Sequence, residues 1–220
     1  TLLGELLAQA QSVFDPSTTA EARAAVLEQI ARLLRLVEAK FGAELPIGER
    51  DRYASLAQQA AGTLVGIARV RATDISDCVE PLIDVAIAMG NKTPAASTSC
   101  LTAVREALGI APKTLPERLG AEPLAGKLHG LYDSLFKENG AQSLFIALLA
   151  IYAEMGQAPQ DILDAVLKEL LSNAEAASDP LSPDGATTTR RGAIRRLLTR
   201  TTRGIEAQAV MINAFLDKPY

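Results

Sequence analysis

The stretch "TTAEARAAVLEQIARLLRLVEAKFG", residues 18–42, shows the fold class most clearly. Its large apolar side chains recur every three or four residues, which places them on one face of an α-helix. They are Val26, Ile30, Leu33, Leu34, Val37 and Phe41. Thr18 followed by Glu21 has the pattern of a capping box, and Gly42 is a typical helix terminator. We therefore predict a long amphipathic helix that buries one face.

The same helical spacing continues along the rest of the chain. No stretch longer than a few residues alternates apolar and polar side chains as a half-buried strand does. Glycine, proline and capping residues delimit further predicted helices, at about 2–14, 49–71, 76–89, 94–109, 122–138, 142–155, 159–175 and 190–220. We expect an all-α fold, a compact multi-helix bundle of about eight or nine helices. No repeat of fixed period is apparent.

Of the 220 residues, 48% are hydrophobic, 22% charged and 4% aromatic, which is the balance of a soluble globular protein. The most continuous apolar run, "SLFIALLAIYAEMG" (Ser143–Gly156), is shorter than the roughly 20 residues that cross a bilayer. We interpret it as a core helix or as one shared across a subunit interface. Cys78 and Cys100 are too few for a disulfide scaffold. We expect two buried thiols in a reducing, cytoplasmic (intracellular) compartment.

One compositional break divides the chain. "SDPLSPDGATTT", residues 178–189, is rich in proline, glycine, serine and threonine, and it predicts a linker loop. The loop separates a helical bundle domain, 1–177, from a C-terminal basic amphipathic helix, 190–220. A further division of the bundle into two subdomains near 110–121 stays open. Because the C-terminal helix is too long to be stable through propensity alone, we expect its apolar face to dock on the bundle or on a neighbouring subunit.

That C-terminal helix carries the strongest charge asymmetry of the chain. From residue 187 onward there are seven basic and two acidic residues, a net charge of +5, whereas the preceding 186 residues have 15 basic and 24 acidic residues, a net charge of −9. Guanidinium groups suit phosphate and carboxylate ligands. We predict that the arginines form a binding site for an anionic partner. The predicted site residues are Arg190, Arg191, Arg195, Arg196, Arg200 and Arg203.

Three kinds of anionic partner are compatible with this helix. Nucleic acid, DNA or RNA, fits the spacing of Arg190–Arg203, but the polar face has no aromatic side chain for base stacking and the rest of the chain would repel a polyanion. A membrane surface is disfavoured, because tryptophan and lysine anchors are scarce. A solvated or salt-bridged face is favoured, which includes docking against acids of this chain or of another subunit. The acids considered on this chain are Glu80, Asp84, Asp161 and Asp164.

Catalytic patterns are sparse. His129 is the only histidine, so no two-histidine metal site can form. The pairs Glu80/Asp84 and Asp161/Asp164 have helical spacing, and we interpret both pairs as structural. "MGNKTP" (Met89–Pro94) lacks the upstream glycine of a phosphate loop. We therefore predict no catalytic residue, no metal site and no cofactor.

A weak helix-turn-helix pattern lies in residues 81–109, around Gly90. Its second helix offers only hydroxyl side chains before Arg105, and we interpret the segment as an ordinary helix pair. The sequence as a whole indicates a non-enzymatic helical interaction or assembly protein, with a protein partner or self-association. A nucleic-acid-binding protein is the first alternative, and an enzyme with a pocket between helices is the second.

Overall fold

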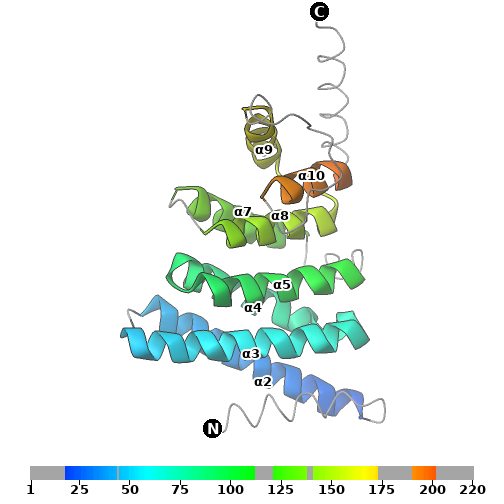
Figure 1. Ribbon diagram of the computed structural model, residues 1–220. Coiled ribbons are helices and arrows are strands. Elements are labelled where there is room, and N and C mark those ends of the chain that lie inside the picture. The colour runs from blue at the N-terminus through cyan, green and yellow to red at the C-terminus, as the bar shows by residue number, and fades with distance from the viewer. Residues whose placement is uncertain (1–17, 44, 112–120, 138–140, 173–189, 202–220) are drawn as a thin grey trace, which may run out of the picture. The chain divides into compact units, whose positions relative to one another are not determined.

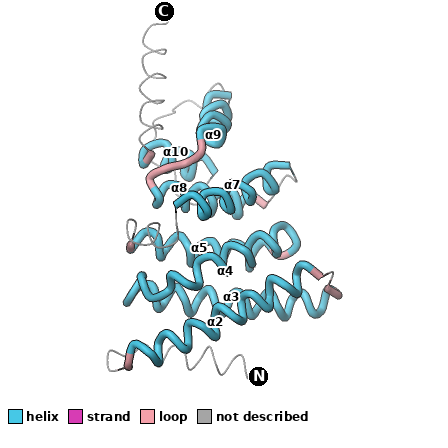
Figure 2. The backbone as a smooth tube through the Cα atoms, turned by 180° about the vertical axis from the view of Figure 1, so that it is seen from behind, coloured by secondary structure: helices cyan, strands magenta, loops and turns pink. Residues whose placement is uncertain are grey.

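The computed structural model describes residues 18–43, 45–111, 121–137, 141–172 and 190–201. Within these ranges the chain forms eight α-helices, two short 3₁₀ helices and no strand, and Figure 2 shows only helix and loop there. The all-α prediction is therefore confirmed for the described residues. The helix predicted over 2–14 lies outside them, and so does the part of the C-terminal helix beyond Thr201.

The helix bounds follow the sequence signals closely, and those of α4 and α8 are as predicted. The elements are α2 (Ala20–Gly42), α3 (Ile47–Arg71), η1 (Ala72–Ile75), α4 (Ser76–Met89), η2 (Gly90–Lys92), α5 (Pro94–Ile110), α7 (Ala121–Lys137), α8 (Gln142–Met155), α9 (Gln160–Ser172) and α10 (Arg190–Arg200). The predicted capping residue of α2 is wrong by one position. Thr19, not Thr18, is the N-cap, and its Oγ1 accepts a hydrogen bond of 3.3 Å from the backbone N–H of Ala22.

Contacts within the chain divide it into two compact units, residues 1–144 and 145–220. This division lies inside α8 and coincides with neither of the two divisions that composition suggests. The predicted linker, 178–189, lies outside the described residues, so the linker itself stays a prediction.

The first unit contains two helical hairpins that stack on each other, α2 with α3 and α4 with α5 (Figure 1). The most extensive packing joins α2 to α4, α3 to α5, and α4 to α5. Near the start of α2, Arg23 pairs with Asp74, just before α4, at 3.3 Å. Near the end of α3, Arg69 lies 4.0 Å from Glu106, near the end of α5. Equivalent helices of the two hairpins therefore run in the same direction, as in α-solenoid repeats.

The lengths of the hairpins explain why no period is visible in the sequence. The helices α2 and α3 have 23 and 25 residues, whereas α4 and α5 have 14 and 17. The stack therefore repeats in space without repeating at a constant interval along the chain. The turn between α4 and α5 depends on Gly90, whose φ of 42° is a conformation that side chains disfavour.

The core of the first unit is aliphatic, as composition predicts. The stripe predicted for α2 is buried from Ile30 to Phe41, and Val26 is half-buried. On α3 the contact face consists largely of alanines, which allows a close approach to α5. Its fully buried alanines are Ala57, Ala60 and Ala68, with Ala61 at 1% exposure. Burial of these faces, at about 25 cal/mol per Å² of apolar surface, drives the stacking.

In the second unit, α8 supplies most of the large buried side chains. Phe145, Leu148, Leu149, Ile151 and Tyr152 are all buried, which confirms the interpretation of this run as a core helix. Among the described helices, none has the combination of length and apolarity that spanning a bilayer requires. Packing between α9 and α10 completes the described part of this unit.

The described part of α10 buries one face. Ala193, Ile194, Leu197 and Leu198 are at most 1% exposed, and so is Thr201 just after the helix. These side chains form one stripe at helical spacing. Arg195, Arg196 and Arg200 lie outside this stripe.

Candidate functional site

The arginines of α10 were the predicted binding site. The structure describes the side chains of Arg195, Arg196 and Arg200. Arg203 and the side chains of Arg190 and Arg191 lie outside its described part. Arg195 is half-buried, and Arg196 and Arg200 stand one helical turn apart on the same side of the helix.

Arg196 and Arg200 share one carboxylate, that of Glu154 near the end of α8. Arg196 Nη2 donates to Glu154 Oε1, and Arg200 Nη1 donates to Oε2 at 2.8 Å. The Glu154 side chain is only 10% exposed, whereas those of Arg196 and Arg200 are 30% and 51% exposed. A carboxylate at this depth requires a cation, because desolvation destabilises an unpaired charge. Two of the predicted site residues therefore stabilise the fold of the second unit.

Glu154 was not among the acids that the sequence suggested for this role. It is nevertheless the only acidic residue in the apolar run Ser143–Gly156. A single carboxylate inside a helix that is otherwise buried must find a cation or lie at the surface. That isolation is the signal by which sequence reasoning could have found it.

The pair Glu80 and Asp84 on α4 binds Lys127 of α7. Lys127 Nζ lies 2.7 Å from Glu80 Oε1 and 2.7 Å from Asp84 Oδ1. Burial lowers the pKa of Lys127, but the hydrogen bonds to Asp84 and Glu80 outweigh it and hold the pKa above its usual value. The carboxylates therefore form a structural ion cluster between two helices. On α9, Asp164 Oδ1 accepts a hydrogen bond of 2.7 Å from Gln160 Nε2.

His129 lies on α7, with 35% of its side chain exposed. Its Nδ1 is 3.9 Å from Asp133 Oδ2, too far for a hydrogen bond, and its ring centroid is 6.5 Å from that of Tyr132. Within the described ranges, no three side chains of histidine, cysteine, aspartate or glutamate gather closely enough to hold a metal ion.

Cys78 and Cys100 are free thiols with no exposed surface, which confirms the prediction of buried thiols. Burial raises the pKa of each from 9.0 to about 12, and at Cys78 the charge of Asp77 adds to the effect while that of Arg35 opposes it. Cys78 Sγ donates to the carbonyl oxygen of Leu27 at 3.5 Å. Both thiols are therefore protonated near neutral pH and are poor nucleophiles.

The hydroxyl side chains of the weak helix-turn-helix pattern form hydrogen bonds within the chain. Ser97 is fully buried and donates to the carbonyl oxygen of Ala86 at 2.7 Å. Thr98 Oγ1 donates to Ser143 Oγ at 3.2 Å, and Ser99 Oγ donates to the carbonyl oxygen of Ala95. These bonds favour the interpretation of α4 and α5 as an ordinary helix pair.

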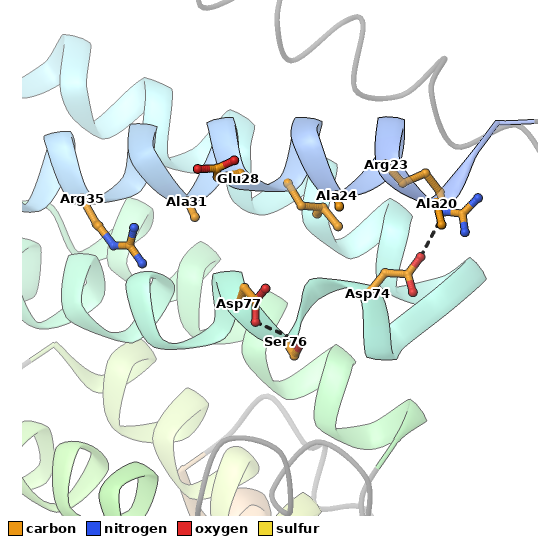
Figure 3. A pocket seen from close by; sticks show the side chains of 10 residues that line it. Ala20, Arg23, Ala24, Glu28, Ala31, Arg35, Asp74, Ser76 and Asp77 are labelled. Carbon is orange, nitrogen blue, oxygen red and sulfur yellow. Dashed lines mark hydrogen bonds and ion pairs between the residues drawn. The ribbon is translucent and has the colours of Figure 1, made fainter.

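A groove of about 400 Å³ opens between α2, η1 and the start of α4 (Figure 3). On α2 its lining residues recur every three or four positions, so they form one continuous face of the helix. The α2 residues are Ala20, Arg23, Ala24, Leu27, Glu28, Ala31 and Arg35, and the opposite wall consists of Asp74, Ser76 and Asp77. Alanines at this spacing beside the apolar stripe were the sequence signal for the groove, and sequence reasoning did not use it.

The charges that line the groove differ in their partners. Arg23 is held by Asp74 at one end, and Glu28 pairs with Arg32 at 2.6 Å, with both side chains more than half exposed. Arg35 is exposed and forms no hydrogen bond or ion pair with any residue that the structure describes. Figure 3 shows it at the end of the groove away from Asp74. Comparisons with protein-family models, curated proteins and solved structures found no match.

Proposed function

We propose that this chain is a non-enzymatic interaction or assembly protein that binds a protein partner in the groove of α2, η1 and α4. The observation that carries the proposal is the open groove of about 400 Å³ with the uncommitted guanidinium of Arg35 at one end. Small side chains on its α2 face allow another backbone to approach closely. An amphipathic helix in a groove is a common mode of recognition between proteins, and stacked helical hairpins present such surfaces.

The proposal leaves fewer of the C-terminal arginines to bind an external anion. Arg196 and Arg200 already neutralise Glu154, so contact with an external anion would compete with that pairing. Arg190, Arg191, Arg195 and Arg203 stay candidates for contact with an anionic partner. Nucleic-acid binding through this helix stays a hypothesis that no observation on the described residues favours.

The enzyme alternative receives little support from the groove. Its lining includes neither His129 nor the carboxylate pairs on α4 and α9. The acids that do line it are Glu28, Asp74 and Asp77. Glu28 and Asp74 pair with arginines, and Asp77 accepts a hydrogen bond from the neighbouring Ser76. An interaction surface is therefore the better interpretation of the groove.

Photo-crosslinking from two positions of α2 tests the proposal. Ala24 lines the groove, whereas Ala22 is exposed about 160° further round the same helix. A photo-reactive amino acid is incorporated at each position in cells that make the protein. The crosslinked products are then identified by mass spectrometry. We expect a discrete crosslinked protein from position 24, its yield reduced by Arg35→Glu, and none from position 22. Equal products from both positions, or none from position 24, would contradict a partner in the groove.

A further inference from the structure

We infer that the occupant of the groove is a second copy of this chain, bound so that the two α2 helices lie antiparallel across a two-fold axis. This inference rests on the proposed function, because it names the partner of the same groove. A two-fold interface brings the same surface of both copies together, so that surface must complement itself when its direction is reversed. The groove face of α2 has this property.

The charges show the complementarity first. Glu28 and Arg35 lie on the groove face, and the midpoint between them along the helix falls between Ala31 and Arg32. A two-fold axis at this midpoint places Glu28 of one copy opposite Arg35 of the other, and it does so twice. Arg35 has no partner within the described chain, so the dimer would supply one. Opposite charges that meet across an interface also set its register.

The small residues show the same register independently. With the axis between residues 31 and 32, Ala24 of one copy faces Ala39 of the other, and Ala20 faces Ala43. All four alanines are exposed. Ala20, Ala24 and Ala39 lie with Glu28 and Arg35 within about 100° of the helix circumference. Ala20 and Ala24 line the groove, Ala39 continues the same face beyond it, and Ala43 is the C-cap just after the helix. Alanine contacts permit helix axes about 8 Å apart, at the close end of the usual range.

The existing partner of Glu28 does not prevent this pairing. Glu28 bonds Arg32 within the same helix, and the two side chains are 59% and 62% exposed. An exposed pair of this kind contributes little to stability, so exchanging it for a pair at an interface costs little. Arg32 itself lies beside the axis and keeps access to solvent.

The test measures self-association of the purified full chain by sedimentation equilibrium from micromolar to millimolar concentration. Glu28→Arg and Arg35→Glu each place like charges opposite one another twice, so each is expected to raise the dimer Kd by about tenfold or more. The double variant E28R/R35E restores opposite charges and is expected to return the Kd close to that of the unmodified chain. Lys40→Glu is the control, because it reverses an exposed charge on the same helix away from the groove face.

A second measurement does not depend on charge reversal. Arg32→Cys places a thiol beside the two-fold axis, and we expect mild oxidation to give a covalent dimer faster than with Lys40→Cys. The native thiols do not interfere, because Cys78 and Cys100 are buried and protonated. Circular dichroism of each variant checks that its helices are retained.

Three results would overturn the inference. They are a monomer at every concentration, a dimer that neither single charge reversal weakens, and a double variant that fails to restore association. The proposed function can be judged apart from this result. If the purified chain is monomeric while position 24 crosslinks to a different protein, the groove is an interaction surface and only the second copy is excluded.

Discussion

Both α2 and α10 are amphipathic helices that carry arginines, but the arginines of the two helices differ in their ion-pair partners. On α10, Arg196 and Arg200 hold a carboxylate that is only 10% exposed, 42 and 46 residues earlier in the chain. On α2, Arg35 lies at the edge of an open groove and has no partner among the described residues. The same residue type on an amphipathic helix therefore stabilises one region and leaves an uncommitted charge in the other. A run of arginines in a sequence does not show which of these it is.

The largest loss of stability is expected from removing Arg196 and Arg200, the two arginines that pair with Glu154. In the double variant Arg196→Ala with Arg200→Ala, Glu154 would keep its burial and lose both cations. We expect the free energy of unfolding to fall by about 1–3 kcal/mol, discounted for the partial exposure of both arginines. Urea denaturation followed by circular dichroism measures it. Adding Glu154→Leu should recover part of the loss, and unchanged stability of the double variant would show that the ion pairs contribute nothing.

An intermediate effect is expected from pH in the first unit, whose buried titratable thiols must stay neutral. Because the folded pKa of Cys78 and Cys100 is about 12 against 9.0, their contribution is complete below about pH 9 and decreases as pH rises toward 12. For each thiol, the free energy of unfolding would fall by up to about 1.4 kcal/mol per pH unit in that interval. Denaturation between pH 9 and 10 measures the slope, and comparison with Cys100→Ala separates the share of Cys100 from that of other groups that titrate in this interval. Cys100→Ala should reduce the slope, and an unchanged slope would contradict its assignment to Cys100.

The smallest change in stability is expected from the substitution of Arg35. Arg35→Ala removes no hydrogen bond or ion pair within the described chain, so the unfolding free energy of the monomer should change by less than about 0.5 kcal/mol. Denaturation at a concentration well below the dimer Kd measures it. Arg23→Ala is the matched comparison on the same helix, because the Arg23 side chain is 13% exposed and bonds Asp74. A loss at Arg35 as large as that at Arg196 and Arg200 would mean that Arg35 also stabilises the fold.

Most of the secondary structure could be predicted. The bounds of α4 and α8, the buried stripe of α2 and the burial of both thiols were predicted from spacing, caps and composition. Helical hydrogen bonds join residues four positions apart, so the information that starts and ends a helix is local. The N-cap of α2 was wrong by one residue because Thr18 and Thr19 offer the same side chain to the same helix end.

The contents of the candidate site could not be predicted in the same way. The acids considered on this chain for the C-terminal arginines were Glu80, Asp84, Asp161 and Asp164, whereas the acid that pairs with Arg196 and Arg200 is Glu154. Glu80 and Asp84 bind Lys127 instead. An ion pair depends on which helices pack together, and many combinations of helices are compatible with the same amphipathic patterns. The stacking of α2 on α4 and of α3 on α5 is one such combination.

Local sequence was therefore sufficient for the helical class of this protein, for most helix ends and for the faces that are buried, because each depends on residues within a few turns. The partners of its charges and the existence of the groove depended on packing. The alanines of α2 line a groove only because η1 and the start of α4 stand beside them, and Arg35 is uncommitted only because no acid was brought to it. Contacts between distant segments are set by the sum of many small burial energies, which no single segment contains.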